Sequence, residues 1–189
     1  AALQGVIPAQ NNLGKMYSMG FGVKSDKQKA VYWFTQAANS NDSIAQANLA
    51  MMYLKGDGVE MDVDLAVKLF KKSGEQGNLS SMLQLGEMFG NGNIVTQDYK
   101  EAFYWYEKAL KKHDNVTALF HVGLYYYKGY GVVVDEEQGL RLIKQAKESL
   151  IYKISSRDTS KYKDLTLDSI ITFEEAIQIY RCITGACEI

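Results

Sequence analysis

Several residue types are scarce in this sequence, and each shortage excludes a class of protein. Only two cysteines occur, Cys182 and Cys187, and both lie near the end of the 189-residue chain. Two cysteines placed there support neither a disulfide framework nor a multi-cysteine zinc site. A single proline, among many Ala, Leu, Lys and Gln residues, favours helices over strands. No apolar run approaches the roughly 18–20 residues that span a bilayer, so we expect no insertion into a membrane.

An excess of charge of either sign is also missing. The chain has 21 Lys and Arg residues against 22 Asp and Glu residues, for a formal net charge of −1. Because such a chain has no overall positive field to hold a polyanion, we do not expect nucleic acid as a partner. The first residues, "AALQGVIP", have no basic flank and no long apolar segment, so we expect no uncleaved signal peptide there. The oligomeric state stays open.

Pairs of glycines are the feature that the sequence does have. The stretch "KGDGVEMD", residues 55–62, resembles the beginning of a phosphate-binding loop. Such a loop needs a strand before the glycines and, after them, a third glycine or a Gly-Lys-Ser/Thr sequence. Here a helix is predicted before the glycines, and neither continuation follows. We therefore interpret these glycines as a turn between two helices.

The glycine turn occurs four times at nearly constant spacing, which indicates an internal repeat. Each repeat is predicted to form a helix, a turn and a second helix. The matching segments start at Leu13, Leu49, Leu85 and Val122, so the offsets are 36, 36 and 37 residues. We place the repeats at 9–44, 45–80, 81–117 and 118–152, after an N-terminal extension over residues 1–8.

Each repeat also contains signals for the ends of its helices and for its core. Gly56 is placed to end the first helix of repeat two in a left-handed conformation, and Asn41 closes the second helix of repeat one. The spacing of Asp98 and Glu101 predicts a capping box in repeat three. Positions that all repeats share are predicted to be core, among them Trp33, Leu69, Trp105 and Leu142, and the column Met16, Met52, Met88 and Tyr125.

The repeated pattern A-x-A-x-x-L-G-x-x-Y-x-x-G-x-G-V, followed by D, A, W-F and A-A, resembles the Sel-one-like repeat family, relatives of the tetratricopeptide repeats. The resemblance covers residues 9–152. It implies an all-α fold, a right-handed α/α superhelix whose first helices line a concave face. Family members mostly act as scaffolds or adaptors, and some bacterial members are immunity proteins beside secreted toxins. The compartment, a bacterial cytoplasm or periplasm, stays open.

Repeat three and the cysteines depart from the family pattern. Ile94 stands where the other repeats have Gly22, Gly58 and Gly131. Because a β-branched residue does not easily take a positive φ, we expect the third turn to use Gly90, Gly92 or Asn93 and to follow a different path. A cysteine-rich secreted branch of the family, which binds β-lactams, has a cysteine pair in each repeat. No such pairs occur here, which argues against β-lactam binding.

Positions where the repeats differ are the candidates for partner binding. On the first helices these positions lie at i, i+3 and i+7, which gives one stripe for each helix, and stacking of the repeats is expected to place the stripes side by side. The alternative is a solvated face on which residues vary without function. We name this set the variable stripe, and it consists of Asn12, Lys15, Met19, Asn48, Met51, Lys55, Gln84, Glu87, Asn91, His121, Leu124 and Lys128.

The sequence offers little for catalysis. His113 and His121 are the two histidines, and no Ser, Cys or acidic residue is spaced to form a triad with them. Two histidines without a third ligand do not make a metal site. We therefore predict a non-catalytic scaffold or adaptor, without metal or cofactor, that binds a protein or peptide on its concave face. The alternatives are an immunity protein that neutralises a secreted toxin, and a small-molecule-binding or hydrolytic groove protein.

The repeat pattern fades after Leu150. Residues 153–168 are polar and are predicted to form a linker. In residues 169–189, Thr172 and Glu175 have capping-box spacing, which predicts a C-terminal helix. This helix either caps the fourth repeat or begins a truncated segment. Whether Cys182 and Cys187 form a disulfide stays open.

Overall fold

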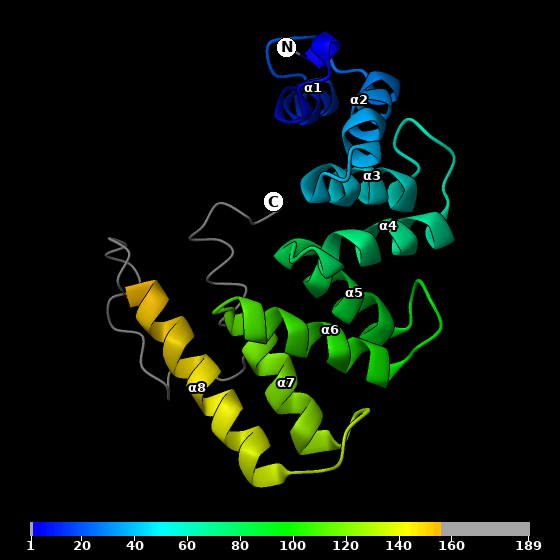
Figure 1. The fold of residues 1–189 in the computed structure, drawn as a ribbon. Helices are drawn as coiled ribbons and strands as arrows, with labels where there is room; N and C mark the ends of the chain where they lie inside the picture. Colours follow the sequence, from blue (N-terminus) through cyan, green and yellow to red (C-terminus); the bar gives the residue numbers. More distant parts are fainter. Residues whose placement is uncertain (1, 156–189) are drawn as a thin grey trace. The chain divides into compact units, whose positions relative to one another are not determined.

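The computed structural model describes residues 2–155, and these residues form α-helices joined by turns (Figure 1). The expected C-terminal helix, the rest of the expected linker and both cysteines lie outside the described residues. A short 3₁₀ helix, η1 (Ala2–Gln4), precedes α1. The α-helices are α1 (Ile7–Met19), α2 (Lys27–Asn39), α3 (Ser43–Lys55), α4 (Val63–Glu75), α5 (Leu79–Asn91), α6 (Tyr99–Lys112), α7 (Val116–Lys128) and α8 (Glu136–Ser155).

The all-α prediction is confirmed, and the helices form two compact units. The first unit ends at Lys112 and the second begins at His113. In the first unit the hairpins α1–α2, α3–α4 and α5–α6 follow one another, and each hairpin also packs on the next through α2–α3 and α4–α5. The turns after α3 and α5 extend to the same side of this unit (Figure 1). The first unit therefore repeats one hairpin along the chain, as expected for a solenoid-like fold.

The glycine turns end helices, as predicted. Gly56 follows α3 in a left-handed conformation with φ of 69°, and its N–H donates to the Met52 carbonyl. Gly20, Gly92 and Gly129 end α1, α5 and α7 in the same way. A helix, not a strand, leads into Gly56, so the phosphate-loop interpretation is excluded. Asn41, with φ of 65°, is also left-handed, as its predicted role after α2 requires.

Aspartates cap the second helices, but the predicted capping box in repeat three is only half formed. The Asp98 carboxylate accepts the Glu101 backbone N–H at 3.1 Å. The return bond from the Glu101 side chain was predicted wrongly, because the Asp98 N–H already donates to the Phe89 carbonyl at 2.9 Å. Glu101 instead accepts from the Trp105 indole N–H at 3.0 Å and pairs with Lys71 at 2.7 Å.

The third turn differs from the others in the way the sequence indicates. Gly92 is left-handed with φ of 68°, as its counterparts are, but Ile94 is not left-handed, whereas Gly22, Gly58 and Gly131 at the same position are. The Gln97 side chain donates to the Gly90 carbonyl at 2.8 Å and supports this path. At the position of Ile94, repeat two has Gly58, where an added Cβ would lie 2.5 Å from the Lys27 carbonyl carbon. Repeat two therefore tolerates no side chain at this position, whereas repeat three carries isoleucine.

The core lies between the two helices of each hairpin and between neighbouring hairpins. Four residues of the two predicted core columns are buried, namely Met52, Met88, Trp105 and Tyr125, whereas Trp33, Leu69 and Leu142 are half-buried. The core prediction was wrong for Met16, which is 37% exposed, so the N-terminal repeat is looser at this position than the other repeats. Glycines on the first helices make room for rings of the second helices. A Cβ at Gly86 would lie 2.7 Å from the Tyr106 ring.

Buried polar groups join the second and third hairpins. Ser81 on α5 donates its hydroxyl to Ser73 on α4 at 2.8 Å, and Ser73 donates to the Ser43 carbonyl at 2.6 Å. Ser73 and Ser81 are fully buried. Because both hydroxyls donate, neither is left as an unsatisfied buried donor.

The second unit is a hairpin of α7 and α8. Its helices cross closely because Gly139 stands where the other repeats have alanine, and a Cβ there would lie 2.6 Å from the Tyr127 backbone nitrogen. Tyr125 and Leu150 are buried in this hairpin. The helix α8 continues to Ser155, three residues into the segment for which a linker is predicted.

Candidate functional site

The variable stripe is accessible in the first unit. Its members on α1, α3 and α5 are exposed or half-buried, and none is buried. The residues between them on the same helices are core, such as Leu49 and Met52 on α3 and Leu85 and Met88 on α5. Each first helix therefore has one face in the core and the variable stripe on a face that solvent reaches.

One stripe residue, Asn48, bonds to the neighbouring first helix through an amide pair. Asn48 on α3 donates its side-chain N–H to the Asn11 side-chain oxygen on α1 at 3.0 Å. Asn11 is 5% exposed, so this bond is largely removed from water. Sequence reasoning missed Asn11. The available signal was that Asn11 is polar where repeats two and three have Ala47 and Leu83.

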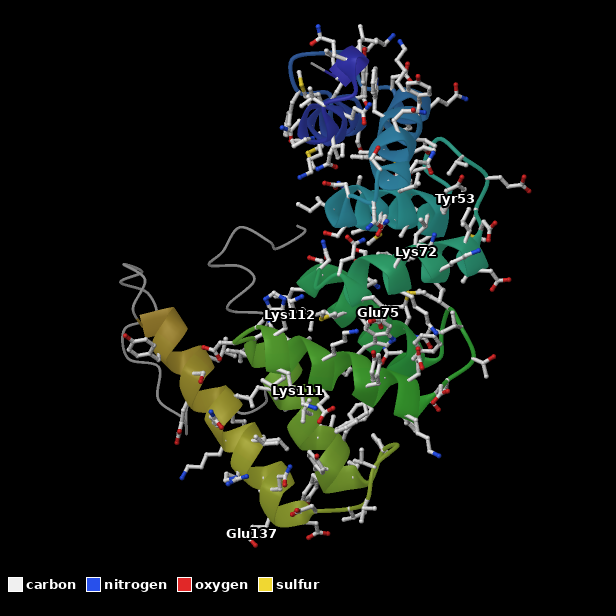
Figure 2. All side chains as sticks on the ribbon, viewed as in Figure 1. Tyr53, Lys72, Glu75, Lys111, Lys112 and Glu137 are labelled. Carbon is white, nitrogen blue, oxygen red and sulfur yellow. The ribbon has the colours of Figure 1, made fainter. Side chains whose placement is uncertain are left out.

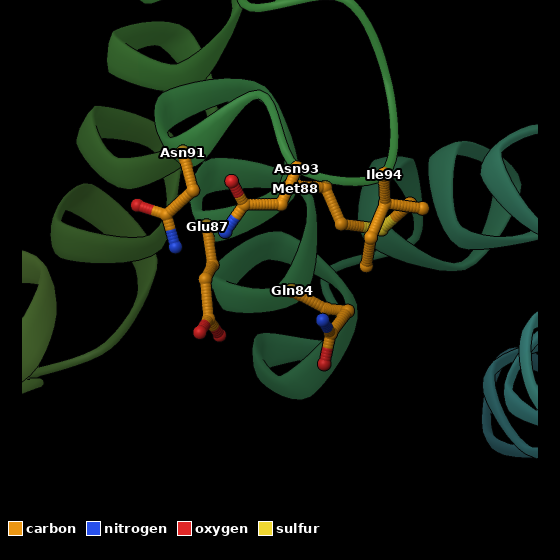
Figure 3. Close-up of a pocket in the computed structure, with 6 residues that line it drawn as sticks. All are labelled: Gln84, Glu87, Met88, Asn91, Asn93 and Ile94. Atoms are coloured by element: carbon orange, nitrogen blue, oxygen red, sulfur yellow. The ribbon is translucent and has the colours of Figure 1, made fainter.

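A small hollow lies on α5 and the turn that follows it, with a volume of about 110 Å³. Figure 3 shows stripe residues leaving one face of α5, with Met88 extending toward Ile94 on the turn. We name it the repeat-three hollow. Its lining consists of Gln84, Glu87, Met88, Asn91, Asn93 and Ile94. Three of these belong to the variable stripe. Asn93 and Ile94 were not predicted as site residues, although Ile94 had been singled out as a departure from the repeat.

The polar side chains of the hollow have no bonding partners among residues 2–155. Gln84, Glu87, Asn91 and Asn93 make no side-chain hydrogen bond and no ion pair there. Two of the corresponding groups of repeat two are engaged, because Asn48 bonds to Asn11 and Asp57 pairs with Lys27 at 3.7 Å. Repeat three therefore presents a set of unused hydrogen-bonding groups at one place.

The second helices carry ion pairs that stabilise the packing. Glu75, near the end of α4, faces α6 (Figure 2) and pairs there with Lys108, while the Tyr104 hydroxyl donates to it at 3.0 Å. The hydrogen bond from Lys108 lowers the pKa of the Glu75 carboxyl. These groups satisfy one another, so they are better explained as a clasp between α4 and α6 than as a binding site.

The stripe residues of the second unit lie on α7. Lys128 is exposed and its Nζ lies 5.1 Å from the centre of the Tyr127 ring, while Leu124 is half-buried. His121 is half-buried, and its burial lowers the pKa of the imidazole to about 4. The imidazole is therefore neutral at pH 7.

The described residues contain neither a metal cluster nor a membrane helix. Within residues 2–155, no three His, Cys, Asp or Glu side chains come together as metal ligands would. None of the helices in this part of the chain is long and apolar enough to cross a bilayer.

Similar structures come from bacterial proteins. The chain is 32% identical to c5321, a protective antigen present in uropathogenic Escherichia coli strains that displays an SLR fold, over 98% of this chain and 39% of that chain, with a TM-score of 0.73. It is 28% identical to a Sel1 repeat protein from Oxalobacter formigenes, over 78% of this chain and 42% of that chain, with a TM-score of 0.70. The chain thus spans about two fifths of the length of each of these proteins.

The repeats themselves match a family profile. No curated protein matches the chain. The profile described as the Sel1 repeat matches residues 7–42, 43–78, 79–114 and 116–149. Repeats of this kind typically mediate protein interactions and are generally non-catalytic. The match covers the hairpins of both compact units, and the chain belongs to the Sel1 repeat family.

Proposed function

We propose that this chain is a non-catalytic interaction scaffold that binds a partner protein or peptide along its variable stripe. One observation carries the proposal. In the first unit, all stripe residues except Asn48 make no side-chain hydrogen bond and no ion pair within residues 2–155, although their neighbours on the same helices form the core. Side chains that the fold does not use are available to a partner.

The chemistry of the stripe favours a protein or peptide over a small molecule. It combines amides, charges of both signs and accessible apolar groups, among them Met19, which is 62% exposed. Such mixtures are common on protein-binding surfaces. A small-molecule site is usually an enclosed, mostly apolar cavity of roughly 300–1,000 Å³. The repeat-three hollow, at about 110 Å³, is smaller.

The proposal is tested with peptides selected on the full chain from a random display library. The stripe variant combines Lys15→Glu and Lys55→Glu, which reverses two charges on α1 and α3. We expect selected peptides to bind this variant at least about tenfold more weakly, a change of roughly 1.4 kcal/mol. Fluorescence anisotropy measures the affinity.

A matched variant separates stripe binding from a general effect of charge. Lys68→Glu combined with Lys100→Glu reverses two exposed charges on the second helices α4 and α6, and peptide affinity should stay within about twofold of the wild type. Circular dichroism checks that both variants keep their helical content. If the selected peptides bind the stripe variant as tightly as the wild type, the stripe is not the binding surface.

A further inference from the structure

The repeat-three hollow has features that select one kind of side chain from a partner. It is lined by one carboxylate, three side-chain amides and the apolar side chains of Met88 and Ile94, and no Lys or Arg lines it. We propose that the hollow binds an arginine side chain of an extended segment of the partner. This inference rests on the proposed scaffold function and names the recognition chemistry of one part of the variable stripe.

The hollow is particular to repeat three. At the position of Glu87, repeats one and two have Lys15 and Met51, so only repeat three of the first unit places a negative charge there. At the position of Ile94 these repeats have Gly22 and Gly58. The side chain of Ile94, 47% exposed, thus supplies an apolar wall that glycine cannot provide.

The charge of the hollow favours a cation. Glu87 is exposed and has no ion-pair partner among the described residues, so its carboxylate is free to accept. A cationic donor would form charge-assisted hydrogen bonds, which are about twice as strong as bonds between neutral groups. An acidic side chain would meet the like charge of Glu87 instead. Because the hollow is open to water, the binding free energy should depend on ionic strength.

The distribution of acceptors favours arginine over lysine. The amide oxygens of Gln84, Asn91 and Asn93 and the carboxylate of Glu87 offer acceptors from several positions around the hollow (Figure 3). A guanidinium group has five donors spread over a plane, whereas an ammonium group has three donors at one point. The aliphatic part of an arginine can also lie against Ile94, which is exposed, in the way that long basic side chains cover apolar surface.

The test is an NMR titration of the full chain with N-acetyl-arginine amide as the probe. The side-chain NH₂ signals of Gln84, Asn91 and Asn93 report directly on the hollow. We expect them to shift and saturate, with a Kd on the order of millimolar because the probe is a single residue. N-acetyl-citrulline amide, which has the same shape without the charge, should bind at least about tenfold more weakly, and N-acetyl-lysine amide should lie between the two.

Variants assign the effect to particular side chains. Glu87→Gln should weaken arginine binding about tenfold and remove most of its dependence on salt between about 0.05 and 0.5 M. Glu60→Gln, which removes an exposed carboxylate from the turn of repeat two, should leave the titration unchanged. Ile94→Gly restores the residue of the other repeats and should reduce the preference for arginine over lysine.

Three outcomes of the titration overturn the inference. They are unchanged NH₂ signals, equal binding of the citrulline and arginine probes, and equal binding by the wild type and Glu87→Gln. Peptides that are selected without arginine and still depend on the stripe would also overturn it, while leaving the scaffold function intact. Saturable, Glu87-dependent binding of the arginine probe supports the hollow even if no selected peptide depends on the rest of the stripe, a result that would reject the scaffold function alone.

Discussion

Single side chains link the hairpins of the first unit, and Trp105 is the largest of them. It is 2% exposed and its indole N–H donates to Glu101, which in turn pairs with Lys71 on α4. An added Cβ at Gly74 on α4 would lie 2.8 Å from the Trp105 ring. The tryptophan thus fills a space that α4 leaves open for it, so its packing and its hydrogen bond act at one place.

We expect Trp105→Ala to reduce the free energy of unfolding by about 3–5 kcal/mol, because the substitution removes a buried ring and leaves a cavity. Urea denaturation followed by circular dichroism measures the loss. Trp33→Ala is the matched control, since Trp33 occupies the same position of repeat one but is only half-buried. Its cost should be clearly smaller, and equal costs would contradict the burial described for the two residues.

The half-buried imidazole of His121 makes stability depend on pH in a defined direction. Burial lowers its pKa from 6.5 to about 4 in the folded chain. Between these values the unfolded chain binds more protons, so stability rises with pH. The contribution is complete above pH 6.5 and is lost as the pH falls toward 4. Its full size is at most about 3 kcal/mol, because the residue is partly exposed.

We expect His121→Gln to flatten this dependence, since glutamine does not titrate. Urea midpoints of the wild type and of the variant are compared between about pH 7 and pH 4.5. Acidic residues titrate in both proteins, so the informative quantity is the difference between the two curves. A difference that is constant over this range would show that His121 does not carry the effect.

At the scale of elements, the turns explain why the repeats are not equivalent. Gly58 and Gly22 hold the same place in repeats two and one, with φ of 74° and 71°. An added Cβ at Gly58 would lie 2.5 Å from the Lys27 backbone at the start of α2, whereas at Gly22 the nearest atom is Met16 Cε at 3.5 Å. The turn of repeat two is thus pressed against the preceding hairpin.

We expect Gly58→Ala to destabilise the protein more than Gly22→Ala. Both substitutions meet the strain of a left-handed conformation, roughly 1–2 kcal/mol, but only the change at Gly58 adds a collision with backbone. Thermal unfolding of the two variants and the wild type measures the difference. Equal losses at the two positions would mean that the turn of repeat two can move away from α2 at little cost.

The helix ends could be predicted from the sequence because they depend on nearby residues. The left-handed glycine at Gly56 and the aspartate cap at Asp98 need only a few neighbouring residues to form. The Glu101 side chain could not be predicted, since its partners Trp105 and Lys71 compete with the local bond and Lys71 belongs to another hairpin. Local rules fail where a side chain reaches a tertiary partner.

The candidate site was predicted in part for the same reason. Helical spacing identified Gln84, Glu87 and Asn91, because residues at i, i+3 and i+7 share a face. The repeat-three hollow also needs Asn93 and Ile94, whose positions depend on the path of the turn. Sequence comparison between repeats marked Ile94 as unusual, but it did not indicate that the isoleucine forms a wall beside Met88.

At the scale of the whole molecule, the division into two units affects how unfolding is observed. Both tryptophans, Trp33 and Trp105, lie in the first unit, whereas helices occur in both. Tryptophan fluorescence therefore follows the first unit alone, and far-UV circular dichroism follows the entire chain. In a repeat protein, stability is approximately a sum of contributions from individual repeats and their interfaces.

We expect the urea transitions recorded by the two probes to differ in midpoint or steepness, because fluorescence follows the first unit and circular dichroism follows both. Coincident transitions are the criterion for two-state unfolding. Fluorescence and circular dichroism are recorded on the same samples. Substitutions in the second unit, such as His121→Gln, should move the circular dichroism transition more than the fluorescence transition. Coincident transitions that shift together would show that the two units unfold as one cooperative block.

The unequal room around the turn glycines limits where new specificity can arise. In repeat two, any side chain at Gly58 collides with the neighbouring backbone, so we expect substitutions at this position to destabilise the fold. Around Gly22 there is space, so a side chain there meets the strain of the left-handed conformation but no collision with backbone. In the first unit, a side chain at this turn position is therefore compatible with the neighbouring backbone in repeats one and three, whereas repeat two requires glycine.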